Sequence, residues 1–268
     1  MYGRLLQILP ALFFLGAIPV LVILGASREM AKYWIPFVSI LLSYEALAGV
    51  VGSYAASKGV LSIYPIDKAI WGFNVTGWVQ STFFSPIVTQ ITTFFYTLHF
   101  PLIVITCLVL WYANRKIFGK YMATMIMTTY ACLVTFILLP TAPPWYQGVA
   151  VDLYQSASAA TLPSSLTSFM FSFESDKFAA FPSLHAAYAI IFSYFMIKLD
   201  RRLAFVAIPV TVGVLFSTLY LGQHYLIDLV AGAMYALIPC LISEKLNIQI
   251  PSPKRKNHSS TERSSQPT

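Results

Sequence analysis

Two histidines and one carboxylate in the last third of the sequence have the types and spacing of a nucleophilic or acid–base site. His224 and Asp228 are four residues apart, so on a helix their side chains lie on one face. There the carboxylate holds one imidazole nitrogen and leaves the other free, as an oriented nucleophile requires. His185 stands 39 residues upstream of His224, which is enough chain to go down one helix and return along another. We therefore expect both histidines at the same end of a helix pair.

The residues before His185 favour anion binding. Proline is common in the first turn of a helix, so Pro182 predicts that Ser183 and His185 lie at a helix N-terminus. The unpaired N–H groups of that turn attract phosphate. Two imidazoles, a carboxylate and a helix N-terminus, without a nearby thiol, indicate phosphoryl transfer through a phosphohistidine. In this hypothesis His224 attacks phosphorus and His185 protonates the departing oxygen.

A zinc ion held by His185, His224 and Asp228 is an alternative interpretation of the same residues. Catalytic zinc sites usually place their ligands at compact spacings such as HExxH, and the sequence has none. We therefore expect no metal and no cofactor. The three cysteines all fall within apolar runs and are predicted to be buried side chains.

The composition is that of an integral membrane protein. Of the 268 residues, 57% are hydrophobic and only 10% are charged, against about 25% charged in soluble domains. The net charge of +7 does not indicate a nucleic-acid partner, because the basic residues lie in short loops and one tail between apolar runs. The expected surroundings are a membrane and a lipid phosphate substrate, while the oligomeric state is left open.

Seven apolar runs approach the roughly 20 residues needed to cross a hydrocarbon core. They are residues 5–26, 34–53, 89–112, 121–140, 183–199, 203–221 and 225–243. The predicted fold is an all-α polytopic membrane helix bundle with six core transmembrane helices, six or seven in total. We expect one transmembrane domain over residues 1–250, followed by a disordered cytoplasmic tail over 251–268.

The distribution of basic residues predicts the orientation of this bundle. If seven spans alternate and the C-terminus is cytoplasmic, thirteen Lys and Arg residues lie inside and only Arg4, Lys58, Lys68 and Lys177 lie outside. That bias places His185, His224 and Asp228 at the non-cytoplasmic face. The long connection 147–180 would lie on the same face, where it is positioned to cover the site.

Two titratable residues within the apolar runs need partners. Placing the ionisable side chain of Glu45 within the membrane is energetically unfavourable, so we expect it to face other helices. His99 is followed by Pro101, which removes a backbone donor and is expected to bend the helix. The partner of His99 is predicted to be Glu45, a backbone carbonyl or the substrate itself.

The two histidine segments resemble the type 2 phosphatidic acid phosphatase superfamily of membrane lipid phosphatases and phosphotransferases. Its second motif, Pro-Ser-Gly-His, corresponds to Pro182–His185, with Leu184 in place of glycine. Its third motif, Ser-Arg, five residues, His, three residues, Asp, corresponds to Ser217, His224 and Asp228, with threonine in place of arginine. The resemblance covers roughly the C-terminal half of the chain and implies a six-helix core that needs no metal.

Three further segments resemble the inositol phosphorylceramide synthase-like branch, whose members transfer a phospho-headgroup to a lipid hydroxyl. They are Pro140–Trp145, Phe178–Phe181 and Gln223–Tyr225. The superfamily's first motif, Lys, six residues, Arg-Pro, is not matched, so its basic phosphate ligands are replaced by other groups. The substrate contacts that we predict are Ser183, Ser217, Gln223, Lys177, Pro144, Trp145 and His99.

The chain is thus predicted to be a multi-pass membrane phosphoric ester hydrolase or phosphotransferase, with His224, His185 and Asp228 as its catalytic residues. If water attacks the phosphohistidine, the protein is a phosphatase acting on a lipid phosphate or diphosphate. If a lipid hydroxyl attacks, it is a headgroup transferase of the inositol-phosphate type. A non-catalytic scaffold or a transporter is the remaining alternative, because the motif arginines are absent.

Overall fold

The computed structural model describes residues 33–35, 37, 59–156, 178–248 and 250. Several of the predicted features lie outside these residues. They are the run 5–26, most of the run 34–53 with Glu45, the residue Lys177 and the tail 251–268. The predicted boundary between the transmembrane domain and the tail therefore stays a prediction.

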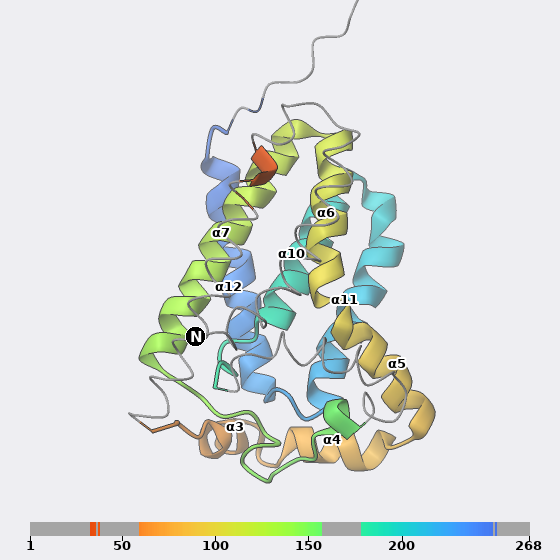
Figure 1. Cartoon of the computed structure of the whole chain (residues 1–268), viewed down its shortest axis with the longest axis vertical. Helices are drawn as coiled ribbons and strands as arrows, with labels where there is room; N and C mark the ends of the chain where they lie inside the picture. The colour runs from red at the N-terminus through yellow and green to blue at the C-terminus, as the bar shows by residue number, and fades with distance from the viewer. Residues whose placement is uncertain (1–32, 36, 38–58, 157–177, 249, 251–268) are drawn as a thin grey trace, which may run out of the picture.

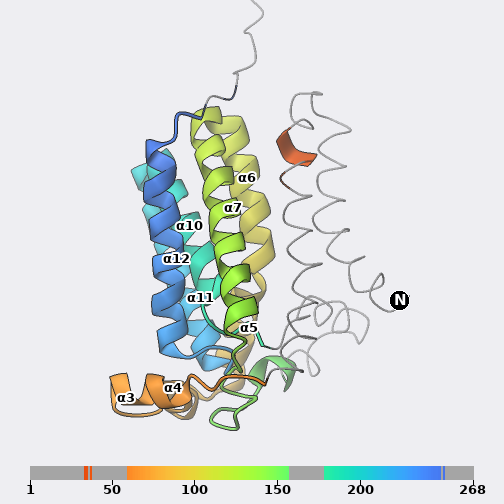
Figure 2. The ribbon, with the colours of Figure 1, turned by 90° about the vertical axis from the view of Figure 1, so that its left-hand side faces the viewer.

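The described part of the chain is a bundle of helices that run side by side (Figures 1 and 2). Its members are α5 (Pro86–Thr97), α6 (His99–Ala113), α7 (Arg115–Leu138), α10 (Leu184–Leu199), α11 (Ala204–Tyr220) and α12 (Leu226–Lys245), with a 3-10 turn at Arg201–Leu203 before α11. The described residues form no strands, only helices and isolated β-bridges. Fully buried side chains such as Phe136, Ile191 and Phe195 fill the space between α7, α10 and their neighbours. The predicted all-α class is confirmed.

Membrane crossing is supported by length and composition. Among the described residues, α7, the segment Arg201–Tyr220 and α12 are each long and apolar enough to span a membrane. The pair α5 and α6 makes a fourth span if the two helices count as one bent helix, and α10 is a shorter apolar helix. The chain is a multi-pass membrane protein, while the count of six core helices stays a prediction.

The predicted span 89–112 is broken in the structure. Helix α5 ends at Thr97 and α6 begins at His99, with a bend of 50° between them. Pro101 lies in the first turn of α6. N–H groups in that turn have no partner within the helix, so the missing N–H of proline costs no hydrogen bond there. His99 therefore lies at a helix start inside the bundle.

The next predicted span also begins earlier than its apolar run. Helix α7 starts at Arg115 because the side chain of Asn114 accepts hydrogen bonds from the N–H groups of Lys116 and Ile117, both at 3.1 Å. This cap satisfies two donors that a helix start otherwise leaves unpaired. The basic residues expected in a loop thus form the first turns of a transmembrane helix.

Two short helices, α3 (Tyr64–Trp71) and α4 (Val75–Phe83), lie across one end of the bundle (Figures 1 and 2). Most of their large exposed side chains are apolar, among them Ile66, Ile70 and Trp78. Amphipathic helices with exposed aromatic residues are typical of the headgroup region of a bilayer. We call α3 and α4 the interfacial platform.

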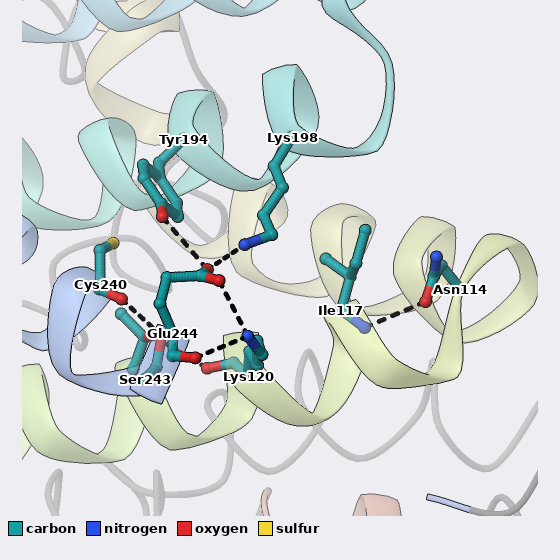
Figure 3. Close-up of polar contacts among 9 residues, drawn as sticks. Asn114, Ile117, Lys120, Tyr194, Lys198, Cys240, Ser243 and Glu244 are labelled. Carbon is teal, nitrogen blue, oxygen red and sulfur yellow. Dashed lines mark hydrogen bonds and ion pairs between the residues drawn. The ribbon is translucent and has the colours of Figure 1, made fainter. Parts of the chain in front are cut away.

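An ion cluster joins three helices at the opposite end of the bundle (Figure 3). Glu244 of α12 accepts a hydrogen bond from Lys120 of α7 at 2.8 Å and forms a second ion pair with Lys198 of α10. The hydroxyl of Tyr194, also on α10, donates to the same carboxylate at 3.1 Å. The last turn of α12 is thereby fixed to α7 and α10.

Candidate active site

Three histidines meet at the end of the bundle that carries the interfacial platform. His185 lies in the first turn of α10 and His224 in the turn between α11 and α12, with their ring centroids 5.8 Å apart. His99, at the start of α6, lies on another side of His185, with ring centroids 4.1 Å apart. The expected meeting of the two motif histidines is therefore found, and a third imidazole joins them.

The length of α10 sets the depth of this cluster. The helix has 16 residues. At 1.5 Å per residue it is about 24 Å long, which is shorter than the hydrocarbon core of about 30 Å. Its first turn lies further into the bundle than the ends of α11 and α12 beside it (Figure 1). His185, in this first turn, is only partly exposed.

The imidazole of His224 is held in one tautomer. Its Nδ1 lies 2.9 Å from the main-chain carbonyl oxygen of Ala180 and 3.5 Å from Oδ2 of Asp228. A carbonyl oxygen can only accept a hydrogen bond, so Nδ1 carries a proton, and in the neutral ring Nε2 then carries the lone pair. A buried histidine with an unprotonated Nε2 is suited to nucleophilic attack.

Asp228 links the two motifs of the site. Its Oδ2 accepts a hydrogen bond from the N–H of Tyr225 at 2.8 Å, which caps the start of α12. Its main-chain oxygen accepts from the N–H of Ser183 at 3.0 Å, just before α10. Gly232, one turn further along α12, allows this approach, because a Cβ atom there would lie 2.4 Å from the carbonyl oxygen of Ser183. The starts of α10 and α12 are thus fixed against each other.

The segment that presents Ala180 to His224 is itself held by Thr141. The N–H of Thr141 donates to the carbonyl of Phe178 at 2.8 Å, and the N–H of Phe181 donates to the Thr141 hydroxyl, also at 2.8 Å. Thr141 is buried, at 1% exposure. The segments Pro140–Trp145 and Phe178–Phe181, which carried part of the resemblance, therefore lie against each other beside His224.

Gln223 and Trp145, two of the predicted substrate contacts, are hydrogen-bonded to each other. The indole N–H of Trp145 donates to Oε1 of Gln223 at 3.1 Å, and Nε2 of Gln223 donates to Asp152 at 2.9 Å. The N–H of Trp145 also donates to the carbonyl of Gly222 at 3.1 Å, and Pro144 is buried next to it. These contacts bind the 141–156 loop to the α11–α12 turn, so any contact of these residues with substrate stays a prediction.

The two serines of the motifs use their hydroxyls locally. Ser183 is the N-cap of α10, with its Oγ accepting from the N–H of Ala186 at 3.2 Å. Ser217 donates to the carbonyl of Val214 at 2.7 Å, within its own helix. Both are fully buried. These hydrogen bonds do not test the predicted contacts of the two serines with phosphate. Lys177, another predicted substrate contact, lies outside the described residues.

Aromatic rings surround His185. Tyr96 of α5 stacks on its imidazole with ring centroids 4.2 Å apart, and Tyr154 packs against Tyr96. His99 in turn stacks on Tyr188, whose hydroxyl forms a 2.6 Å hydrogen bond with Thr129. Sequence reasoning missed Tyr96 and Tyr188 because aromatic residues are frequent throughout the apolar runs. Within the described residues, no group of three or more His, Cys, Asp or Glu side chains is arranged to hold a metal ion.

The sequence profile of the PAP2 superfamily matches residues 62–242, which is more than half of the chain and includes all three histidines of the cluster. The chain belongs to the PAP2 superfamily. The family of membrane lipid phosphatases and phosphotransferases that the motifs predicted is thus confirmed, and with it the expectation of a phosphoric ester hydrolase or phosphotransferase at the level of the family.

Curated relatives of this PAP2 chain support the predicted branch. Phosphoinositol dihydroceramide synthase of Bacteroides thetaiotaomicron is 24% identical over 245 residues, which cover 81% of this chain and 78% of the relative. The catalytic subunit of inositol phosphorylceramide synthase from Schizosaccharomyces pombe is 30% identical over 120 residues, 41% of this chain. Inositol phosphorylceramide synthase of Candida albicans is 30% identical over 122 residues, 37% of this chain.

The extent of these similarities differs. The chain spans 28% and 23% of the lengths of the two fungal relatives, against 78% of the bacterial one. No solved structure matches the chain. The PAP2 assignment and its inositol phosphorylceramide synthase-like branch therefore come from the sequence.

Proposed function

We propose that this PAP2 protein transfers a phosphoinositol-type headgroup from a glycerophospholipid to the hydroxyl of a ceramide-like lipid, through a covalent intermediate on His224. The observation that carries the proposal is the pair of imidazoles whose centroids lie 5.8 Å apart, with the proton of His224 on Nδ1. At this separation one phosphate group can contact both rings. The relative that aligns over most of its own length is named a phosphoinositol dihydroceramide synthase, which supports the choice of substrate.

In the first step, Nε2 of His224 forms a bond to phosphorus while the bond from phosphorus to the diacylglycerol oxygen breaks. His185 donates a proton to that oxygen, and neutral diacylglycerol leaves. The imidazole of His224 becomes positively charged, and Asp228 lies 3.5 Å from its Nδ1 to balance the charge. Oδ1 of Asp228 is buried without a hydrogen-bond partner among the described residues, so its charge is only partly offset before the reaction.

In the second step, His185 accepts the proton of the ceramide hydroxyl, whose oxygen attacks phosphorus and releases His224. Water attacking in place of that hydroxyl would give phosphatase activity. The hydrogen bond from Nδ1 of His224 to the carbonyl of Ala180 holds the ring through both steps, and the bond from the N–H of Tyr225 to Asp228 fixes the residue after it, so the nucleophile need not move. The ring of Tyr96, stacked on His185 and packed against Tyr154, favours a lipid acceptor over water.

The phosphate contacts that replace the missing arginines are proposed to come from His99 and from the backbone N–H groups at the start of α10. His99 lies against His185, and the first turn of α10 carries the positive end of the helix dipole. The positive-inside distribution of Lys and Arg supports a site on the non-cytoplasmic face.

The experiment uses purified protein in liposomes with phosphatidylinositol, with and without dihydroceramide. Formation of inositol phosphoryl dihydroceramide together with diacylglycerol supports transfer, and His224→Ala is expected to abolish both products. Release of inositol phosphate at an undiminished rate when dihydroceramide is present would contradict transfer and assign a hydrolase. Glu244→Gln, which removes a charge at the other end of the bundle, is the control for a general loss of stability.

A further inference from the structure

Asp67 of α3 is a charged residue that is buried, whereas apolar residues of the same helix are exposed. The apolar residues Ile66 and Ile70 of α3 are 56% and 55% exposed, whereas the charged Asp67 between them is 1% exposed. It is the buried residue of α3. A carboxylate is rarely buried so completely unless it has specific partners.

The partners of Asp67 belong to the turn that starts α12. Its Oδ1 accepts a hydrogen bond from the N–H of Ile227 at 2.9 Å and one from the indole N–H of Trp71 at 3.1 Å. The N–H of Ile227 is one of the first-turn donors that have no partner within a helix. Asp67 therefore caps α12 from a separate element, next to the capping bond that Asp228 makes to Tyr225.

Two further contacts connect the interfacial platform to the same turn. The hydroxyl of Thr76, on α4, donates to the main-chain oxygen of His224 at 3.1 Å. The ring of Tyr64, on α3, lies 6.2 Å from that of Tyr225. The platform thus contacts His224 itself, the residue after it and the start of the helix that carries Asp228.

The burial of Asp67 is unfavourable for its charge. Burial raises the pKa of the Asp67 carboxyl above its ordinary value, although the hydrogen bonds from Ile227 and Trp71 act in the opposite direction. The burial of this carboxyl is therefore better explained by the groups that it holds in place than by the stability of its charge.

We propose that Asp67 is a positioning residue, which fixes the turn carrying His224 and Asp228 to the interfacial platform. This inference rests on the proposed function only for the role of His224 as nucleophile. The hydrogen bond to Ile227 N sets where α12 begins, and the start of α12 sets the angle at which His224 faces His185. A shift of about 1 Å at such a nucleophile can reduce turnover a hundredfold.

The test compares three variants in liposomes containing phosphatidylinositol and dihydroceramide. Asp67→Ala removes the acceptor, Asp67→Asn keeps an acceptor of the same shape, and Glu244→Gln removes a carboxylate from the other end of the same helix. We expect Asp67→Ala to lower kcat about 10- to 100-fold with KM changed less than about threefold, and Asp67→Asn to stay within about threefold of wild type. Glu244→Gln is expected to lower the Tm and leave kcat unchanged.

Hydrogen–deuterium exchange separates this inference from the proposed function, because it needs no turnover. In Asp67→Ala the peptide over residues 224–228 should exchange faster, whereas Asp67→Asn and Glu244→Gln should leave it protected. If the wild type has no activity on these lipids but the exchange result holds, the proposed function fails and the positioning role stands. Unchanged exchange in Asp67→Ala, or equal loss of kcat in both Asp67 variants, would overturn the positioning role.

Discussion

The carbonyl oxygen of Ala180 lies 2.9 Å from Nδ1 of His224, closer than the carboxylate of Asp228 at 3.5 Å. The main chain therefore fixes the tautomer of the proposed nucleophile, and the carboxylate lies behind it to balance charge. Because Ala180 belongs to a segment held by Thr141, we expect the reactivity of His224 to depend on a loop contact far from it in sequence.

Thr141→Val tests that dependence. Valine keeps the size of the side chain and removes the hydroxyl that accepts from the N–H of Phe181, so the segment around Ala180 is expected to loosen. We predict that kcat falls about tenfold, equivalent to about 1.4 kcal/mol, with little change in KM. Thr135→Val on α7 removes a hydroxyl that bonds Ala131 and Tyr235 instead of the segment around Ala180, and it is expected to leave kcat unchanged; equal effects of the two substitutions would contradict the role of Thr141.

Gly232→Ala tests the contact between the starts of α10 and α12. The added Cβ would lie 2.4 Å from the carbonyl oxygen of Ser183, so the backbone must move and the bond from Ser183 N to Asp228 is strained. We predict a kcat at least about tenfold lower and a reduced Tm. Val230→Ala, at an exposed position nearby on α12, should change neither by a comparable amount. Wild-type turnover in Gly232→Ala would show that this approach does not position the site.

His99→Phe tests the predicted substrate contact of the third histidine. Phenylalanine can still stack on Tyr188 but lacks the ring nitrogens that would contact phosphate. We predict that KM for the phospholipid donor rises about tenfold or more. Tyr188→Phe, which keeps the ring that stacks on His99 and loses the hydrogen bond to Thr129, serves as the matched control. A purely structural role for His99 would instead lower the Tm and leave KM unaltered.

Asp67→Asn tests the stability cost of the buried carboxylate. The pKa of Asp67 is raised in the folded protein, so between the unfolded and folded pKa values the native state binds more protons than the unfolded chain. The cost is absent below the unfolded value of about 3.9 and fully present above the folded value. In detergent, the Tm of Asp67→Asn should therefore exceed that of wild type at pH 7, by a margin that shrinks as the pH falls. A margin independent of pH would contradict this.

Much of the site could be predicted because its side chains follow simple helical spacing. The four-residue separation of His224 and Asp228 and the helix start at His185 carried both the motif and the chemistry. The partner of Nδ1 could not be predicted, since a main-chain carbonyl has no residue-type signal. The role of Asp67 could not be predicted either, because an acidic residue between Ile66 and Lys68 in a mixed segment has the pattern of a solvated turn.

The fold was predictable in class and less so in detail. Apolar runs located α7, α10, α11 and α12 to within a few residues, apart from the early start of α7 at its Asn114 cap. The break between α5 and α6 was not predicted beyond a bend at Pro101, because hydropathy is continuous across it. That break is what brings His99 against His185.

The most direct test of the account is to trap the covalent intermediate. Purified protein is incubated with phosphatidylinositol labelled in its inositol headgroup, without a ceramide acceptor, then quenched at alkaline pH, because phosphohistidine is labile to acid. We predict label on the peptide that contains His224, its disappearance on adding dihydroceramide, and none in His224→Ala. Turnover without label on the wild-type peptide, or label that persists in His224→Ala, would contradict it.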